Sequence, residues 1–168
     1  MCIVIDTCTM ASVFDTHNVN HKEFAPVLEW IINGHGSMIF GGRKYLQEIP
    51  RGYERLVNEL SRANKAIQLK TNIVDKKQNE LELLVNNEDF DDAHIIAIVI
   101  VARCKLISSL DKRAYKFFRM KSLYPNRFER PSIYSGSRNR GLLVDDNITE
   151  IGKPVFVLPK KVTQSLPL

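Results

Sequence analysis

The 168-residue chain lacks any hydrophobic run of the roughly 18 to 20 residues that a membrane-spanning helix requires. Its first residues carry no basic segment and reach an acidic residue at Asp6, so we expect no signal peptide. Internal repeats and low-complexity segments are missing as well. These absences argue against a membrane protein, and the length favours a single domain with a sizeable core.

Cysteine is scarce. Cys2, Cys8 and Cys104 form an odd set without the paired spacing of zinc ligands. This pattern argues against a disulfide framework and suits thiols in a reducing compartment. We therefore expect a cytoplasmic protein.

An excess of positive charge is missing from the first two thirds of the chain and appears only in the last third. Residues 1–111 carry 12 Lys/Arg and 15 Asp/Glu, whereas residues 112–168 carry 12 and 4, for an overall net charge of +5. An acidic body with a basic last third predicts a polyanionic partner held near an acidic, cation-binding centre. A solvated basic surface that keeps the protein soluble explains the same imbalance.

Short apolar runs alternate with segments of helical periodicity. We expect buried strands at residues 2–5, 37–40, 66–69 and 106–110, an edge strand at 132–134 and a short strand at 154–159. Helices are expected at residues 10–14, 21–33, 43–63, 75–85 and 93–102, and a basic loop at 135–141. Pro50 must kink or split the third helix, because proline removes a backbone donor. The alternation predicts an α/β protein with a mainly parallel sheet covered on both faces.

Residues 91–111 form the most informative stretch. The apolar run at 93–102 is long for a strand, and the carboxylates of Asp91 and Asp92 directly before it can accept the free N–H groups of a first helical turn. The strand that follows is expected to end at Asp111. Taken alone, Asp92 is better explained as a helix cap and Asp111 as a turn residue, so a functional role for either depends on other carboxylates joining them.

Four acidic residues can meet at one edge of such a sheet, because sites form outside the carboxyl ends of parallel strands. Asp6 and Asp111 follow strands, Asp92 opens a helix, and Glu48 lies two helical turns after the second strand. Converging carboxylates raise each other's pKa unless a cation is present. An all-oxygen site suits Mg²⁺ or Mn²⁺, which can activate water for attack on a phosphate.

The same four acids lie in segments that resemble the motifs of a known family. The segments are Ile3-Val4-Ile5-Asp6-Thr7, Lys44-Tyr45-Leu46-Gln47-Glu48-Ile49, Asp91-Asp92-Ala93-His94-Ile95-Ile96-Ala97 and Leu106-Ile107-Ser108-Ser109-Leu110-Asp111-Lys112. They resemble the four motif regions of the PIN domain, a family of metal-dependent ribonucleases that includes many toxins of toxin–antitoxin pairs. The resemblance covers residues 1–143 and leaves 144–168 as a partly irregular C-terminal extension.

The resemblance implies a three-layer α/β/α sandwich and hydrolysis of RNA phosphodiester bonds with bound Mg²⁺ or Mn²⁺. By position it makes Asp6, Glu48, Asp92 and Asp111 the catalytic acids, with Asp6, Asp92 and Asp111 as metal ligands. Ser109 falls where a Thr or Ser usually stands, and its hydroxyl would orient Asp111 or a metal-bound water. Many relatives add an acid a few residues after the fourth motif, where this chain has Arg113 and Phe117.

The expected partner is RNA, in single strands or structured loops, with an antitoxin protein and a second copy of the chain as further candidates. We expect phosphate contacts from Arg43, Lys44, Arg113, Arg138 and Arg140. A wider rim would interleave basic residues with aromatic rings that stack bases, Phe118 being either rim or core. Its members would be Arg113, Arg119, Lys121, Arg127, Arg130, Arg138 and Arg140 with Tyr115, Phe118, Tyr124 and Tyr134.

Two other functions fit parts of the pattern. The missing extra acid suits a catalytically inactive PIN-like module that binds nucleic acid or a protein partner. A phosphatase of the haloacid dehalogenase type would need a second Asp where Cys8 stands. His94, one turn into a buried helix, is expected to pack or hydrogen-bond locally rather than act as a base.

Overall fold

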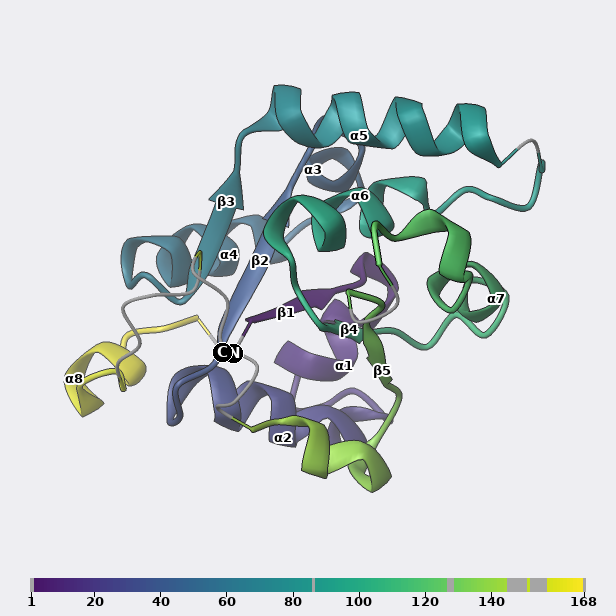
Figure 1. Ribbon diagram of the computed structural model, residues 1–168. Helices are drawn as coiled ribbons and strands as arrows, with labels where there is room; N and C mark the ends of the chain where they lie inside the picture. The colour runs from purple at the N-terminus through teal and green to yellow at the C-terminus, as the bar shows by residue number, and fades with distance from the viewer. Residues whose placement is uncertain (1, 86, 127–128, 145–150, 152–156, 168) are drawn as a thin grey trace.

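The computed structural model describes residues 2–85, 87–126, 129–144, 151 and 157–167 (Figure 1). Over these residues the strands form one five-stranded, all-parallel sheet in the order β3-β2-β1-β4-β5. The strands are β1 Cys2–Ile5, β2 Ser37–Gly41, β3 Ala66–Leu69, β4 Leu106–Ser108 and β5 Ser132–Tyr134. The predicted α/β class and parallel sheet are confirmed, and β5 forms the predicted edge.

Helices cover both faces of this sheet, as in a three-layer sandwich. Figure 1 shows α3, α5 and α6 on one side of the strands and α1 and α2 on the other. The α-helices are α1 Met10–Phe14, α2 His21–Ile32, α3 Arg43–Glu48, α4 Tyr53–Arg62, α5 Thr71–Leu84, α6 Ala93–Ala102, α7 Tyr115–Phe118 and α8 Lys160–Thr163. Short 3-10 turns are η1 Thr7–Thr9, η2 Lys121–Leu123 and η3 Ser137–Leu142. No helix within the described ranges has the length and apolar character needed to cross a membrane.

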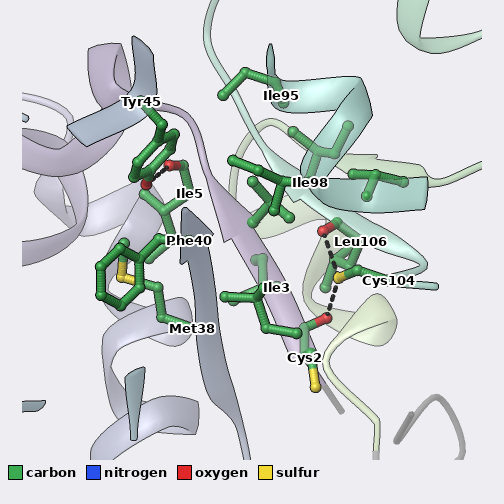
Figure 2. Close-up of a cluster of buried hydrophobic side chains, with 14 of the residues drawn as sticks. Cys2, Ile3, Ile5, Met38, Phe40, Tyr45, Ile95, Ile98, Cys104 and Leu106 are labelled. Atoms are coloured by element: carbon green, nitrogen blue, oxygen red, sulfur yellow. Dashed lines mark hydrogen bonds between the residues drawn. The ribbon is translucent and has the colours of Figure 1, made fainter. Parts of the chain in front are cut away.

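The core is built around β1 and α6. All four residues of β1 are fully buried, because β2 and β4 pair with it on either side. Helix α6 is apolar on every side because it packs against the sheet on one face and against α5 on the other. Figure 2 shows Ile95 and Ile98 of this helix facing Ile3 and Leu106 of the strands.

Proline splits the predicted helix over 43–63, as expected. Helix α3 ends at Glu48, and α4 begins at Tyr53 after Pro50 and a left-handed Gly52. The break leaves Glu48 at the C-terminal end of a short helix rather than inside a long one.

Several predicted boundaries are wrong. Strand β4 stops at Ser108 rather than at residue 110, and α5 begins at Thr71 rather than at Asp75. The basic loop at 135–141 is largely the 3-10 turn η3. The predicted strand at 154–159 lies partly outside the described residues, and residues 157–159 have no regular structure.

Gly42 provides a test of the turn that carries the chain from β2 into α3. Its φ of 81° is left-handed, and an added Cβ would lie 2.6 Å from Cγ1 of the buried Val74. Backbone strain and overpacking each cost about 1–3 kcal/mol. We expect Gly42→Ala to lower the free energy of unfolding by about 2–5 kcal/mol, measured by urea titration.

Gly141→Ala is the matched control. Its Cβ would meet nothing within 4 Å, so the change should stay within about 0.5 kcal/mol of the wild type. Equal unfolding midpoints for the two variants would contradict this account of the turn.

Candidate functional site

Asp6 is fixed at the carboxyl edge of the sheet. Its backbone N–H donates to the Ser108 carbonyl at 2.9 Å, which ties the end of β1 to the end of β4. The carboxylate is only 4% exposed; Oδ1 accepts from the Cys8 N–H at 3.3 Å and Oδ2 from Ser109 Oγ at 2.7 Å. These hydrogen bonds compensate part of the cost of burying a carboxylate.

Ser109 links two of the predicted acids. Its buried hydroxyl donates to Asp6 Oδ2 and accepts from the backbone N–H of Asp111 at 3.1 Å. The hydroxyl therefore orients the Asp6 side chain directly and the Asp111 residue through its backbone.

Asp92 is the N-cap residue of α6, but its side chain makes no capping hydrogen bond. The predicted capping of this helix by the Asp92 carboxylate is therefore wrong. Burial raises the pKa of Asp92 to about 6, helped by the negative charges of Asp6, Asp91 and Asp111 and opposed by His94. The charges of Asp6 and Asp111, two other predicted site residues, therefore act on Asp92. The Asp92 carboxylate makes no hydrogen bond to the N-terminal end of α6.

Glu48 is held by three neighbours. Its Oε2 lies 3.0 Å from His94 Nε2 and 3.4 Å from Thr7 Oγ1, and its Oε1 lies 4.0 Å from Lys44 Nζ. Burial alone would raise the pKa of Glu48, but His94, Lys44 and Thr7 lower it below its ordinary value. The α3 break at Pro50 places this carboxylate beside the first turn of α6.

His94 is 1% exposed and packs beside the Tyr45 ring, at 6.4 Å between centroids. This agrees with the expectation of local packing. Both ring nitrogens are buried and lack a well-aligned hydrogen bond among the described residues, although Nε2 lies 3.0 Å from Glu48 Oε2. The ring thus presents a polar edge to Glu48 inside an otherwise apolar helix.

Asp111 lies three residues beyond the end of β4, not directly after the strand as predicted. Its Oδ1 accepts from the Arg113 backbone N–H at 2.8 Å and from Arg113 Nε at 3.4 Å, and its Oδ2 accepts from Nη2 at 3.2 Å. The hydrogen bond from the guanidinium is the main reason that the pKa of Asp111 lies below its ordinary value.

The donor set fits a hard divalent ion. Asp6, Asp92 and Asp111 offer only carboxylate oxygens, and the raised pKa of Asp92 reflects burial together with repulsion that a cation would relieve. Across the described ranges, no three His, Cys, Asp or Glu side chains already stand together as a preformed metal cluster. Glu48 and Asp111 are instead engaged by basic side chains of the protein.

Two of the predicted phosphate-binding residues line one cavity, and a third lines another. Arg43 and Lys44 line a cavity of about 460 Å³ with residues of α3 and α5, and Lys44 Nζ also donates to the Asp91 carbonyl. Arg113 lines a second cavity of about 350 Å³. Lys44 lies near Glu48 and Arg113 near Asp111, whereas Arg43 lies 4.0 Å from Asp75.

Arg138 and Arg140 belong to η3 and approach α2 instead. Arg140 lines a separate cavity with Trp30 and lies 3.9 Å from Glu29, while Arg138 acts electrostatically on Glu23. The structure does not place them in contact with the four acids, so their role in RNA binding stays a prediction.

The predicted aromatic rim is wrong for Tyr134, which is fully buried, and for Tyr124, which is 6% exposed, because buried rings cannot stack bases. Phe118 is fully buried as well, which confirms the core alternative for that ring. Tyr134 packs edge-on against Phe24, a partner 110 residues away, which local sequence does not reveal. Tyr115 is half-buried and donates to the Ser109 carbonyl. Arg127 lies outside the described residues.

Two hydroxyl residues that support the site were not singled out from the sequence. Tyr45 donates to the Ile5 carbonyl, which directly precedes Asp6 (Figure 2). Thr9 donates to the carbonyls of Asp6 and Ser108 at 2.9 and 3.1 Å. Little in the sequence pointed to either role. Thr9 is a hydroxyl residue a few positions after an expected strand, and Tyr45 is a tyrosine on the apolar face of an expected helix.

Comparison of the chain with protein-family models, with curated protein sequences and with solved structures finds no match. The chemistry of this site therefore has to be argued from its own geometry.

The raised pKa of Asp92 predicts a pH-dependent stability in the absence of metal. The pKa of Asp92 is about 6 in the folded state, against an ordinary value of 3.8. The stability that protonated Asp92 contributes is therefore fully present below pH 3.8 and is lost as the pH rises through 6. The unfolding free energy of Asp92→Asn relative to the wild type should therefore rise by about 1–2 kcal/mol from pH 4 to pH 8. The full pKa shift would correspond to a larger change in unfolding free energy, but the partial solvent exposure of Asp92 reduces that change.

Urea titrations in chelator at pH 4, 6 and 8 measure this difference. A difference between Asp92→Asn and the wild type that stays constant with pH would contradict the electrostatic account.

Proposed function

We propose that this protein is a metal-dependent endoribonuclease that hydrolyses RNA phosphodiester bonds with Mg²⁺ or Mn²⁺ on a PIN-like scaffold. One observation carries the proposal: Asp92 is released from capping α6, and its pKa is raised by burial and by Asp6, Asp91 and Asp111. Asp92 is a buried carboxylate among other negative charges, and a divalent ion would offset the free energy that this costs the fold.

Asp6, Asp92 and Asp111 would hold the ion. A bound divalent ion supplies an activated water and neutralises charge on the phosphate under attack. Ser109 keeps Asp6 in place, and His94 and Thr7 orient Glu48 toward the same edge of the sheet. Lys44 and Arg43 on one side and Arg113 on the other would bind the RNA backbone.

The second candidate is a PIN-like module that binds RNA or a protein partner without turnover. The contact between Arg113 and Asp111 favours it, because a guanidinium already neutralises one of the carboxylates. Binding that weakens with salt, with no cleavage in Mg²⁺ or Mn²⁺, would support this alternative.

Cleavage of labelled RNA tests the nuclease directly. The purified chain is incubated with an unstructured RNA and with a hairpin, in Mn²⁺, in Mg²⁺ and in chelator. We expect cleavage only with metal, and a loss of about 100-fold or more in Asp6→Asn and Asp92→Asn, because losing a metal ligand removes several kcal/mol from transition-state stabilisation.

Asp15→Asn is the control for the chemical change and for contaminating nucleases, and it should cleave at the wild-type rate. Cleavage that persists in chelator, or that both site variants retain, would exclude this mechanism.

A further inference from the structure

Arg113 occupies the carboxylate that the proposed metal would need. A carboxylate offers about four lone-pair positions. On Asp111 the Arg113 backbone N–H uses one at 2.8 Å, and the guanidinium uses two more at 3.4 and 3.2 Å. The protein's own cation and a divalent ion therefore compete for the same oxygens.

The guanidinium is the exchangeable part of this contact. Its two distances exceed the 2.7–2.9 Å or so of a tight charge-assisted pair, whereas the backbone bond is short. The Arg113 side chain is 84% exposed, and exposed ion pairs contribute only about 0–1 kcal/mol. Asp111 stays anchored through backbone N–H groups when the guanidinium leaves, because Ser109 Oγ also holds its main chain.

Arg113 also lines the 350 Å³ cavity, together with Lys112, Lys116 and the acidic residues Glu88, Asp89 and Asp91. Lys116 is paired with Asp89 at 2.8 Å, a carboxylate outside the candidate metal set. A phosphate entering this cavity meets a guanidinium whose present partner is a predicted metal ligand.

We propose that Arg113 couples RNA binding to metal binding: it neutralises Asp111 in the free protein and moves to an RNA phosphate in the complex, which releases Asp111 to the divalent ion. This inference rests on the proposed function. Linkage requires the coupling to be reciprocal, so that RNA tightens metal binding by the same factor as metal tightens RNA binding. Arg113 is thus a substrate-sensing residue that stands where many relatives of the resembled family carry another acid.

Mn²⁺ binding to the full chain, followed by the electron paramagnetic resonance signal of free Mn²⁺, tests the coupling. It is measured with and without a saturating 2′-O-methyl single-stranded oligonucleotide, which a gel must show to be intact afterwards. Mn²⁺ bound by the oligonucleotide alone is subtracted. In the wild type we expect the oligonucleotide to lower the Mn²⁺ Kd about 3- to 10-fold, near the lower end of typical coupling.

Arg113→Gln should bind Mn²⁺ about 3- to 10-fold more tightly than the wild type without oligonucleotide, and adding oligonucleotide should then change little. Arg113→Lys, which keeps the charge, should keep the weaker binding of the free protein. Arg62→Gln removes an exposed guanidinium of α4 that pairs with Glu59 at 2.7 Å, and it should behave as the wild type.

Asp92→Asn separates failure of this inference from failure of the proposed function. If Asp92→Asn loses Mn²⁺ binding while Arg113→Gln binds no more tightly than the wild type, the coupling is overturned and the metal site stands. If Asp92→Asn and the wild type bind Mn²⁺ alike, or neither binds it, the metal site and the coupling are overturned together.

Discussion

The hydrogen bond from Ser109 to Asp6 is the contact on which the candidate site depends. It joins the end of β1 to the segment after β4 and holds a carboxylate that is 4% exposed. Without such donors a buried carboxylate would be costly enough to move or to take up a proton. Thr9 and Tyr45 reinforce the same junction by donating to the carbonyls around it, so the acidic edge is rigid at its centre.

Periodicity was enough to predict most of the fold. Short apolar runs were predicted to be buried strands. The apolar run at 93–102 is longer and was predicted to be a helix, which α6 confirms. The boundaries depended on information that hydrophobicity does not carry. Strand β4 ends at Ser108 because the next side chain, Ser109, turns to Asp6, and that partner lies 103 residues away.

Placing four acids at one sheet edge could also be argued from the sequence, but their partners could not. Arg113 stands two residues from Asp111, and only the backbone conformation there brings the guanidinium back onto the carboxylate. The aromatic rim failed for the opposite reason. Tyr124 and Tyr134 look available between basic residues, yet tertiary packing buries both rings.

The four acids differ in how their negative charge is compensated, and this difference decides where a cation would act first. Asp6 is compensated by hydrogen bonds, Glu48 by His94 and Lys44, and Asp111 by Arg113. Among the four, Asp92 has its pKa raised, first by burial and then by the negative charges of Asp6, Asp91 and Asp111, which His94 opposes. The uncompensated charge is therefore concentrated at the start of α6, next to the rigid Asp6. A divalent ion would meet two carboxylates there at once, and any further ligand would have to be taken from a basic side chain. Under the proposed function, the ion would therefore be bound first by Asp6 and Asp92, and Asp111 would join them once Arg113 leaves it.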